Sequence, residues 1–441
     1  MMLQYQNGVL HLDGVSLDVA TAGRETPFFL FSASRLDANF AALAAGLAGA
    51  GVPGRIRYCA KSNHEPALLT RLAAKGADVL VSHAAEAGLA RDCGFKAECI
   101  AFQKPVLAET ELREVLGVGV GHVHVLRPAD IDLVETCAAA AGRCVKVSLR
   151  LCNDRGFSPL TRLSARLGMS AAEACAAAAR VRECRHLNLH GLHFYIGTQR
   201  RTPSAFIPLL DRALRIAAEL QTAAGVSLAE IDVGGGIPSP TLTQGAWPGL
   251  RQRLLHDADP PEAADAVEAL RRFTADLALV YRERAKRAGL EPVPALTVEP
   301  GRAVAGNAAV LVTRVGAVRG RWAFLDASRN HLPESPLLFT RRVLPVVLAA
   351  SAPRRFQHLS GATLNTTDVL DLARCLPPLQ PGDLLALCDA GVYSLARASR
   401  YAGLTPAAYL VDERGVLQCI RRAEGCADLT ATVAPPEGEH G

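Results

Sequence analysis

Short apolar runs alternate with segments of helical period along the middle of the chain, from about Ile56 to Glu299. Eight of these runs have strand length: IRYCA, DVLVS, ECIAF, HVHVL, VKVSLRL, LNLHGLHFYI, AEIDV and ALTVE. Segments with apolar residues at helical spacing lie between them, such as EPALLTRLAAKG and AETELREVLG. Eight strand–helix repeats are typical of a closed parallel barrel. The pattern therefore predicts an α/β fold built on a (β/α)8 TIM barrel.

The pattern changes after Arg302. The runs AVLVTRVGAV, RWAFLDAS, RRVLPVVLA and DLLALC are β-like and separated by turn residues, and long helical segments are few. GVLHLDG and PFFLF near the start have the same texture. We expect residues 1–32 to join a second, mostly antiparallel β domain formed by residues 301–441, and residues 33–300 to form the barrel.

Composition narrows the class of protein. The 441 residues carry a net charge of +5, which favours neither nucleic acid nor a membrane surface as a partner. The twelve cysteines are scattered without a CxxC pair, so we expect reduced thiols, mostly in the core, and no metal site. No apolar signal segment is visible near the start, and we expect a cytoplasmic protein.

Lys61 is the most informative single residue. It lies in YCAKSNHEPALL, after the first barrel run and before an amphipathic helix. An amine at the mouth of a barrel strand can condense with the carbonyl group of a cofactor once it loses its proton. The alternative is a solvated surface lysine.

Two glycine loops follow the seventh and eighth runs. Gly234, Gly235 and Gly236 follow EIDV, and Gly301 with Arg302 follows ALTVEP. Bare backbone can approach an anion closely, and many barrels bind phosphate in the loops after the seventh and eighth strands. We interpret the two loops as a phosphate site, with a plain tight turn as the alternative for the three glycines.

Glu299 ends the eighth run beside the second glycine loop. A carboxylate that faces a pyridine nitrogen keeps the ring protonated, and a protonated ring is a strong electron sink. A salt bridge from Glu299 to Arg302 is the alternative, and both can hold. Together with Lys61 and the phosphate loops, this carboxylate predicts pyridoxal 5'-phosphate as the cofactor.

Other polar residues close the fifth and sixth runs. His193 and Tyr195 are two positions apart and therefore point to the same face, where one of them can lie flat against a cofactor ring. A core role is the alternative for His193. Thr198 can supply a hydroxyl to a phosphate, and Arg150 can steer a carboxylate.

Five motifs occur in an order that resembles the alanine-racemase-like, fold-type III pyridoxal phosphate enzymes. They are AK-N at Lys61, an H-IG-S-like segment at Tyr195 to Thr198, GGG at Gly234, EPGR at Glu299 to Arg302, and DAG-Y at Asp389 to Tyr393. The chain is most similar to the decarboxylase branch, which includes diaminopimelate and ornithine decarboxylases, as a divergent member. The resemblance runs over nearly the whole chain.

The resemblance implies a homodimer with active sites at the interface between subunits. It implies Lys61 as the lysine that binds the cofactor covalently and Glu299 as the partner of the ring nitrogen. The glycine loop with Gly301 and Arg302 would hold the phosphate, with Tyr393 near it. In the diaminopimelate branch the arginine that matches Arg302 also meets a substrate carboxylate.

The chain departs from the family where substrate is selected and the reaction is completed. Tyr195 replaces the histidine that stacks on the ring. In GATLNTTDVL, Leu364 and Asn365 replace a cysteine that donates a proton and an acid that reads the distal end of the substrate. Glu334 and Leu338 stand where the diaminopimelate enzymes have an arginine and a tyrosine.

We therefore expect a pyridoxal-phosphate-dependent decarboxylase of an amino acid or amino-acid derivative, specialised for a secondary-metabolite or siderophore pathway. Lys61, Tyr195 and Glu299 are the expected catalytic residues. The expected substrate-binding residues are Arg150, Arg302, Glu334, Leu364, Asn365 and Tyr393. A racemase, epimerase or other α-carbon enzyme of the same fold is an alternative, and so is a catalytically silent regulatory relative.

Overall fold

The computed structural model describes residues 3–154, 166–255, 263–348 and 353–433. The chain divides into two compact units. The barrel unit contains residues 36–240 and 263–306. The β unit contains residues 1–35, 241–262 and 307–441.

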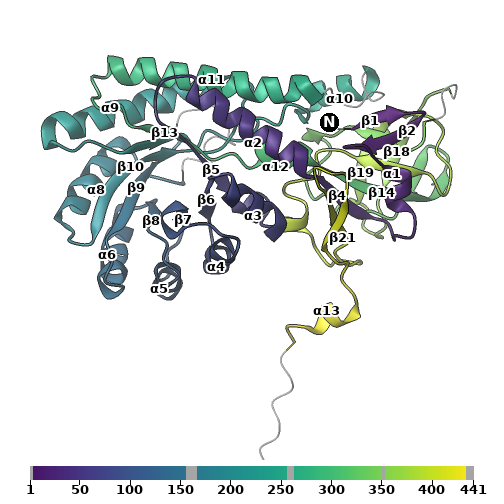
Figure 1. Ribbon diagram of the computed structural model, residues 1–441, viewed down its shortest axis with the longest axis horizontal. Helices are drawn as coiled ribbons and strands as arrows, with labels where there is room; N and C mark the ends of the chain where they lie inside the picture. Colours follow the sequence, from purple (N-terminus) through teal and green to yellow (C-terminus); the bar gives the residue numbers. More distant parts are fainter. Residues whose placement is uncertain (1–2, 155–165, 256–262, 349–352, 434–441) are drawn as a thin grey trace, which may run out of the picture. The chain divides into compact units, whose positions relative to one another are not determined.

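Eight parallel strands close the barrel, which confirms the predicted TIM barrel (Figure 1). In chain order they are β5 (Gly54–Cys59), β6 (Asp78–Val81), β7 (Ile100–Gln103), β8 (His122–Val125), β9 (Val145–Leu151), β10 (Leu187–Phe194), β11 (Glu230–Asp232) and β13 (Ala295–Val298). The ring closes where β13 pairs with β5. The loops after the first, seventh and eighth of these strands therefore meet at one end of the barrel.

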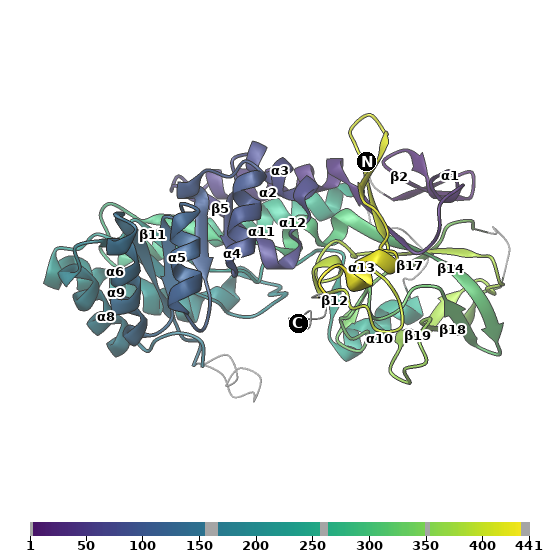
Figure 2. The ribbon, with the colours of Figure 1, turned by 90° about the horizontal axis from the view of Figure 1, so that it is seen from below.

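Helices connect the barrel strands (Figures 1 and 2). They are α2 (Ala33–Ala48), α3 (Pro66–Ala74), α4 (Ala84–Asp92), α5 (Glu109–Gly117), α6 (Ile131–Ala140), α8 (Ala171–Glu183), α9 (Ile207–Ala224), α11 (Ala263–Arg287) and the short α12 (Arg302–Ala305). A capping box between Ser170 and Glu173 starts α8, and Gly225 in the left-handed conformation ends α9. No helix in the described ranges is long and apolar enough to cross a membrane.

The inside of the barrel is polar. Arg57 on β5 contacts His124 on β8 and Glu230 on β11, and such contacts between non-adjacent strands must cross the barrel interior. The buried apolar cluster inside is small and consists of Cys59, Leu80 and Ala101. Because side chains alternate along a strand, the apolar residues between the polar ones face the helices. A network of buried charges therefore replaces the usual apolar filling.

The β unit is built on a nine-stranded, mostly antiparallel sheet, as predicted. Its strands are β4 (Phe28–Ser32), β14 (Ala309–Arg319), β15 (Trp322–Leu325), β17 (Val343–Pro345), β18 (Arg355–Ser360), β19 (Val369–Leu376), β20 (Leu384–Leu387), β21 (Ala407–Val411) and β22 (Leu417–Arg421). The N-terminal β4 lies between β14 and β21, so the beginning of the chain completes this sheet. A small sheet of β1 (Gln4–Gln6), β2 (Val9–Leu12) and β3 (Val15–Ser16) precedes it.

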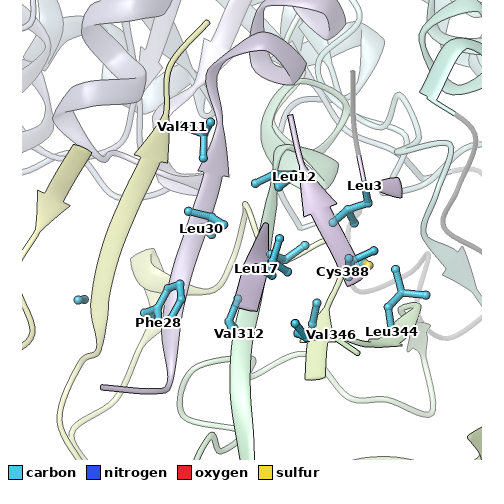
Figure 3. Close-up of a cluster of buried hydrophobic side chains, with 14 residues drawn as sticks. Leu3, Leu12, Leu17, Phe28, Leu30, Val312, Leu344, Val346, Cys388 and Val411 are labelled. Carbon is cyan, nitrogen blue, oxygen red and sulfur yellow. The ribbon is translucent and has the colours of Figure 1, made fainter. Parts of the chain in front are cut away.

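One apolar cluster forms the core of the β unit (Figure 3). Phe28 and Leu30 of β4 point toward it with Val312 of β14, and Leu12 and Leu17 cover it from the N-terminal segment. All five side chains are buried. Burying a side chain of this size stabilises a fold by roughly 1.5–3 kcal/mol, so the first thirty residues are part of this core and not an appendage.

The unit boundaries differ from the predicted domains at one internal segment. We expected residues 33–300 to belong entirely to the barrel, but residues 241–262 belong to the β unit. In this segment β12 (Thr243–Gln244) pairs with β16 (Phe339–Thr340), and α10 (Ala246–Leu255) follows. A side chain at Gly249 would overlap Thr340, so the helix lies close to that strand. A pairing between segments so distant in sequence leaves no local signal.

All twelve cysteines lie in described parts of the chain and are free. Five of them are buried, namely Cys59, Cys93, Cys137, Cys152 and Cys388. The expectation that most cysteines fill the core was therefore wrong, because the others are exposed or half-buried.

Gly46 tests how closely α2 and α11 pack. A methyl group at Gly46 would overlap Thr274 and lie 2.9 Å from the backbone nitrogen of Ala275. We expect Gly46→Ala to lower the free energy of unfolding by about 1–3 kcal/mol, because overpacking must move a helix. Gly88→Ala in α4 is the matched control, since nothing lies within 4 Å of its methyl group, and it should stabilise by up to ~1 kcal/mol. Urea unfolding followed by circular dichroism measures both, and equal effects would contradict the packing.

Candidate active site

Hydrogen bonds from residues next to Lys61 in the sequence hold the loop that carries it. Tyr58 is buried and donates its hydroxyl to the carbonyl of Asn63 at 3.0 Å. The Ser62 hydroxyl donates to the carbonyl of Cys59 at 2.7 Å. The chain turns here through the short 3-10 helix Ala60–Ser62 before α3 begins. The backbone of Lys61 is thus fixed while its side chain extends, exposed, from the carboxyl end of β5.

The surroundings of Lys61 combine acidic and aromatic groups. The Cys59 sulfur raises the pKa of Lys61, burial lowers it, and the Glu299 carboxylate raises it again. The net pKa lies above the ordinary value for a lysine. Burial raises the pKa of Cys59 to about 11. The amine of Lys61 is therefore protonated in the cofactor-free chain and needs a base to react.

The glycine loop after β11 is a bare-backbone surface. Gly234 and Gly236 adopt left-handed φ angles of 67° and 106°. A methyl group on Gly234 would overlap the carbonyl of Phe194, and one on Gly236 would overlap the carbonyl of Gly197. Only glycine fits both the backbone angle and the space. The backbone of the loop after β11 therefore packs directly against the backbone at the end of β10 and in the loop that follows it.

The second glycine loop meets the lysine loop. A methyl group at Gly301 would lie 2.6 Å from the Ser62 hydroxyl, next to Lys61. Arg302 follows as the first residue of α12 and is buried. Thr198 is half-buried in the loop after β10. The barrel thus gathers these predicted phosphate-binding groups at the same end as the predicted lysine.

Glu299 follows β13 and has two different carboxylate oxygens. Oε2 lies 3.2 Å from Nε2 of His193. Oε1 lies 3.9 Å from both Nη1 of Arg57 and Nδ1 of His124, and it forms no hydrogen bond to any described residue. Oε2 is thus bound to His193, whereas the buried Oε1 can still accept a hydrogen bond.

The charge state of Glu299 follows from this environment. Burial raises its pKa, while His193, His124 and Arg57 lower it by more, so the net pKa lies below the ordinary value. Glu299 is therefore an anion at neutral pH. An open, buried anionic oxygen matches the protonated nitrogen of a pyridine ring.

Arg57 is the cation at the centre of the barrel. It is fully buried, its Nη2 lies 3.0 Å from Glu230, and its Nη1 is paired with Asp232. Burial raises the pKa of Glu230, but Arg57 lowers it to about 2 overall. Burial and the nearby Glu299 charge raise the pKa of Asp232, which Arg57 only partly offsets. Arg57 thus holds together carboxylates that would otherwise repel one another.

His124, His193, Asp232 and Glu299 have the composition of a metal site. Their donor atoms all lie within 4.8 Å of one another. The Arg57 guanidinium, however, is paired with Asp232 and lies 3.4 Å from His124. A metal ion would meet this fixed cation in the same space. We therefore interpret the cluster as an arginine-centred network.

Tyr195 and Arg150 complete the mouth of the barrel. Tyr195 is half-buried after β10, and a methyl group at Gly235 would lie 3.6 Å from its ring. Burial raises the pKa of Tyr195, so its hydroxyl is protonated. Arg150 donates from Nη1 to Oε1 of Gln103 at 2.9 Å and from Nε to the carbonyl of Leu167 at 3.3 Å.

Four predicted substrate or cofactor residues belong to the β unit. Glu334 is buried and paired with Arg341 at 2.8 Å. Leu364 is fully exposed, and the neighbouring Asn365 is exposed as well. Tyr393 is half-buried with a left-handed φ of 53°. Their assignment to the site remains a prediction.

The polar network inside the barrel was not predicted from the sequence. Arg57, Gln103, His124, Glu230 and Asp232 were not singled out, although all are buried inside the barrel. Their signal was the polar residue at every second position of runs such as HVHV and EID. In a closed barrel such alternation marks a polar interior.

The residues at the barrel mouth fit a phosphorylated pyridine aldehyde. The two glycine loops expose backbone without side chains, and the loop that carries Lys61 lies next to one of them. The buried Oε1 atom of Glu299 accepts no hydrogen bond from any described residue. Residues 35–306 match the family described as pyridoxal-dependent decarboxylase, pyridoxal binding domain. The chain belongs to this family. It is thus a carboxy-lyase, and its cofactor is pyridoxal 5'-phosphate.

Curated relatives match over almost the full length. The diaminopimelate decarboxylase of Pseudomonas aeruginosa is 29% identical and covers 97% of both chains. The diaminopimelate decarboxylase of Archaeoglobus fulgidus is 26% identical and covers 99% of both chains.

Solved structures confirm the fold. The M. jannaschii diaminopimelate decarboxylase in co-complex with L-lysine has a TM-score of 0.83 at 20% identity and covers 99% of this chain and 98% of its own. The lysine decarboxylase of Selenomonas ruminantium has a TM-score of 0.70 at 22% identity and covers 90% of this chain and 95% of its own.

Arg57 is expected to stabilise the barrel. We expect Arg57→Met to lower the free energy of unfolding by about 3–5 kcal/mol at neutral pH, because it leaves buried carboxylates without a counter-ion. The effect should shrink as pH falls from about 4.5 toward about 2, where Glu230 becomes protonated in the folded wild type.

Arg113→Met is the matched control, since Arg113 forms an exposed pair with Glu109 that solvent screens, and its loss should change stability little. Urea unfolding at several pH values measures both variants. An Arg57→Met variant as stable as the control would contradict the central role of this cation.

Proposed function

We propose that the chain decarboxylates an amino acid or amino-acid derivative other than diaminopimelate, as a specialised enzyme of a secondary-metabolite or siderophore pathway. The observation that supports the reaction class is Glu299, whose buried Oε1 forms no hydrogen bond to a described residue and whose charge raises the pKa of Lys61. Bound pyridoxal phosphate supplies an electron sink for the charge left when carbon dioxide departs.

Each barrel residue has a defined task in this proposal. Lys61 would hold the aldehyde group of the cofactor covalently. Glu299 holds the ring nitrogen protonated, and Tyr195 covers the ring in place of the histidine of relatives. The glycines at 234–236 and 301, with Arg302 and Thr198, would hold the phosphate.

The substrate proposal rests on the residues that differ from the family pattern. Leu364 carries no proton donor, and Asn365 carries no charge. The Oδ1 atom of Asn365 already accepts the backbone N–H of Thr367 at 2.9 Å. The Glu334 carboxylate is paired with Arg341. These side chains lack the free acid and the arginine with which diaminopimelate enzymes read a distal ammonium and carboxylate, which supports a different distal group.

The proton that replaces carbon dioxide must come from another residue than Leu364. Lys61 and Tyr195 are the candidate donors, because both carry protons at neutral pH and lie at the barrel mouth. Water is the third source. Arg302 remains the candidate partner of the substrate carboxylate. We also propose a cytoplasmic homodimer, which the fully exposed Leu364 supports.

A racemase or epimerase is the second candidate. Tyr195 and Lys61 influence each other's pKa, so two acid–base groups lie within electrostatic reach of one α-carbon position. Such a pair can remove and return a proton. A racemase keeps the α-carboxylate, which separates it from a decarboxylase by product analysis.

Substrate profiling tests the proposal. The pyridoxal-loaded protein is incubated with diaminopimelate and with a panel of other amino acids that have basic, acidic and neutral side chains, and carbon dioxide and product chirality are measured. We expect carbon dioxide from at least one of these, with kcat/KM at least about a hundredfold above that for diaminopimelate. Diaminopimelate as the preferred substrate would contradict the proposed specialisation, and an inverted, undecarboxylated product would favour the racemase.

Lys61→Ala provides the control for covalent chemistry. We expect this variant to lose the pyridoxal adduct that borohydride fixes on the wild type, as read by mass spectrometry. Lys75→Ala, which removes an exposed ion pair with Asp37, should keep the adduct. A wild-type chain without any adduct would identify the silent relative instead.

A further inference from the structure

A chain of polar contacts runs across the barrel from Arg150 on β9 through Gln103 on β7 and His193 on β10 to Glu299. We propose that Arg150 and Gln103 fix the tautomer of His193, and that these three positioning residues thereby orient Glu299 toward the cofactor ring. The proposal rests on the pyridoxal function above and assigns new roles within that site.

The orientation of the Gln103 amide is settled by Arg150. A guanidinium only donates hydrogen bonds, and Nη1 of Arg150 lies 2.9 Å from Oε1 of Gln103. The opposite amide orientation would set two donors against each other at this short distance. The amide oxygen therefore faces Arg150, and the amide nitrogen faces the histidines.

The amide nitrogen then decides which ring nitrogen of His193 carries hydrogen. Nε2 of Gln103 has two hydrogens and no lone pair to offer. It lies 3.4 Å from Nδ1 of His193 and 3.2 Å from Nδ1 of His124. Nδ1 of His193 is therefore an acceptor. A neutral His193 must carry its hydrogen on Nε2, which lies 3.2 Å from Oε2 of Glu299 and donates to it.

The same contacts keep His193 neutral. An imidazolium would place a second hydrogen on Nδ1, where it would face the Gln103 amide hydrogens. Burial also lowers the pKa of His193, although the Glu299 carboxylate acts in the opposite direction. Neutral His193 is a directional donor that leaves the negative charge on Glu299.

The relay explains why the two oxygens of Glu299 differ. Oε2 is occupied by His193, so the open lone pairs of the buried Oε1 point away from that contact. A carboxylate fixed before the ligand arrives loses less freedom on binding and is aligned for charge stabilisation. Arg150 acts here through Gln103, which differs from the carboxylate-steering role expected from its sequence position.

Histidine NMR on the cofactor-free chain tests the tautomer directly. With 15N-labelled histidine, the ring nitrogen signals distinguish a proton on Nδ1, on Nε2 or on both. The His193 signal is assigned by its loss in His193→Gln. We expect a proton on Nε2 and none on Nδ1 at neutral pH. A proton on Nδ1, or an imidazolium, would overturn the proposal without any change in the folded state.

Gln103→Glu tests the cause. Its carboxylate still accepts from Arg150 but offers an acceptor to His193, so we expect the proton to move to Nδ1 and Glu299 to lose its donor. Pyridoxal phosphate affinity should fall about tenfold to a hundredfold, as for loss of a hydrogen bond to a charged group. Gln221→Glu in the exposed part of α9 makes the same charge change and should leave tautomer and affinity unaltered. An unchanged His193 tautomer in Gln103→Glu would overturn the relay.

His193 variants separate positioning from packing. We expect His193→Gln, whose amide can donate to Glu299, to retain more cofactor affinity and a more nearly normal pH profile of the cofactor absorption band than His193→Leu. Equal losses in both variants would contradict the positioning role. Because the NMR experiment needs no cofactor, a chain that shows the expected tautomer but never binds pyridoxal phosphate would refute the proposed function and not the hydrogen-bond relay.

Discussion

The buried ion-pair network around Arg57 is the constraint on which the barrel depends. A barrel interior filled with carboxylates and imidazoles requires a compensating charge, since each unpaired buried ion costs several kcal/mol. Arg57 lies between Glu230 and Asp232 and reaches toward Glu299. This arrangement lets Glu299 remain ionised in a buried place, where we propose that it meets the ring nitrogen of the cofactor.

In the proposed site, two glycine loops and one lysine loop lie at the same end of the barrel as this buried charge. The loops come from β11, β13 and β5, which are neighbours in the closed ring although they are far apart in sequence. Closure of the barrel therefore joins the first strand to the last two, and the lysine lies beside the phosphate loops. Glu299, which belongs to the polar interior, follows β13. Lys61 and Glu299 therefore lie at the same end of the barrel.

Much of this was predictable from sequence, for definable reasons. Eight alternating runs predicted the barrel, and their positions after barrel strands predicted that Lys61, Gly301 and Glu299 lie at one end of it. The network inside the barrel was missed, because Arg57 and Asp232 meet only after the ring closes. The placement of residues 241–262 with the β unit was missed for the same reason, since the pairing of β12 with β16 spans nearly a hundred residues. Non-local contacts of this kind have no local signature.

The central claim is that Glu299 keeps the pyridine nitrogen of the bound cofactor protonated. Loading the protein with pyridoxal phosphate labelled with 15N in the ring, and recording the nitrogen chemical shift, measures that proton directly. The account predicts a protonated ring nitrogen in the wild type and an unprotonated one in Glu299→Gln. An unprotonated ring in the wild type, or an identical shift in both proteins, would contradict it.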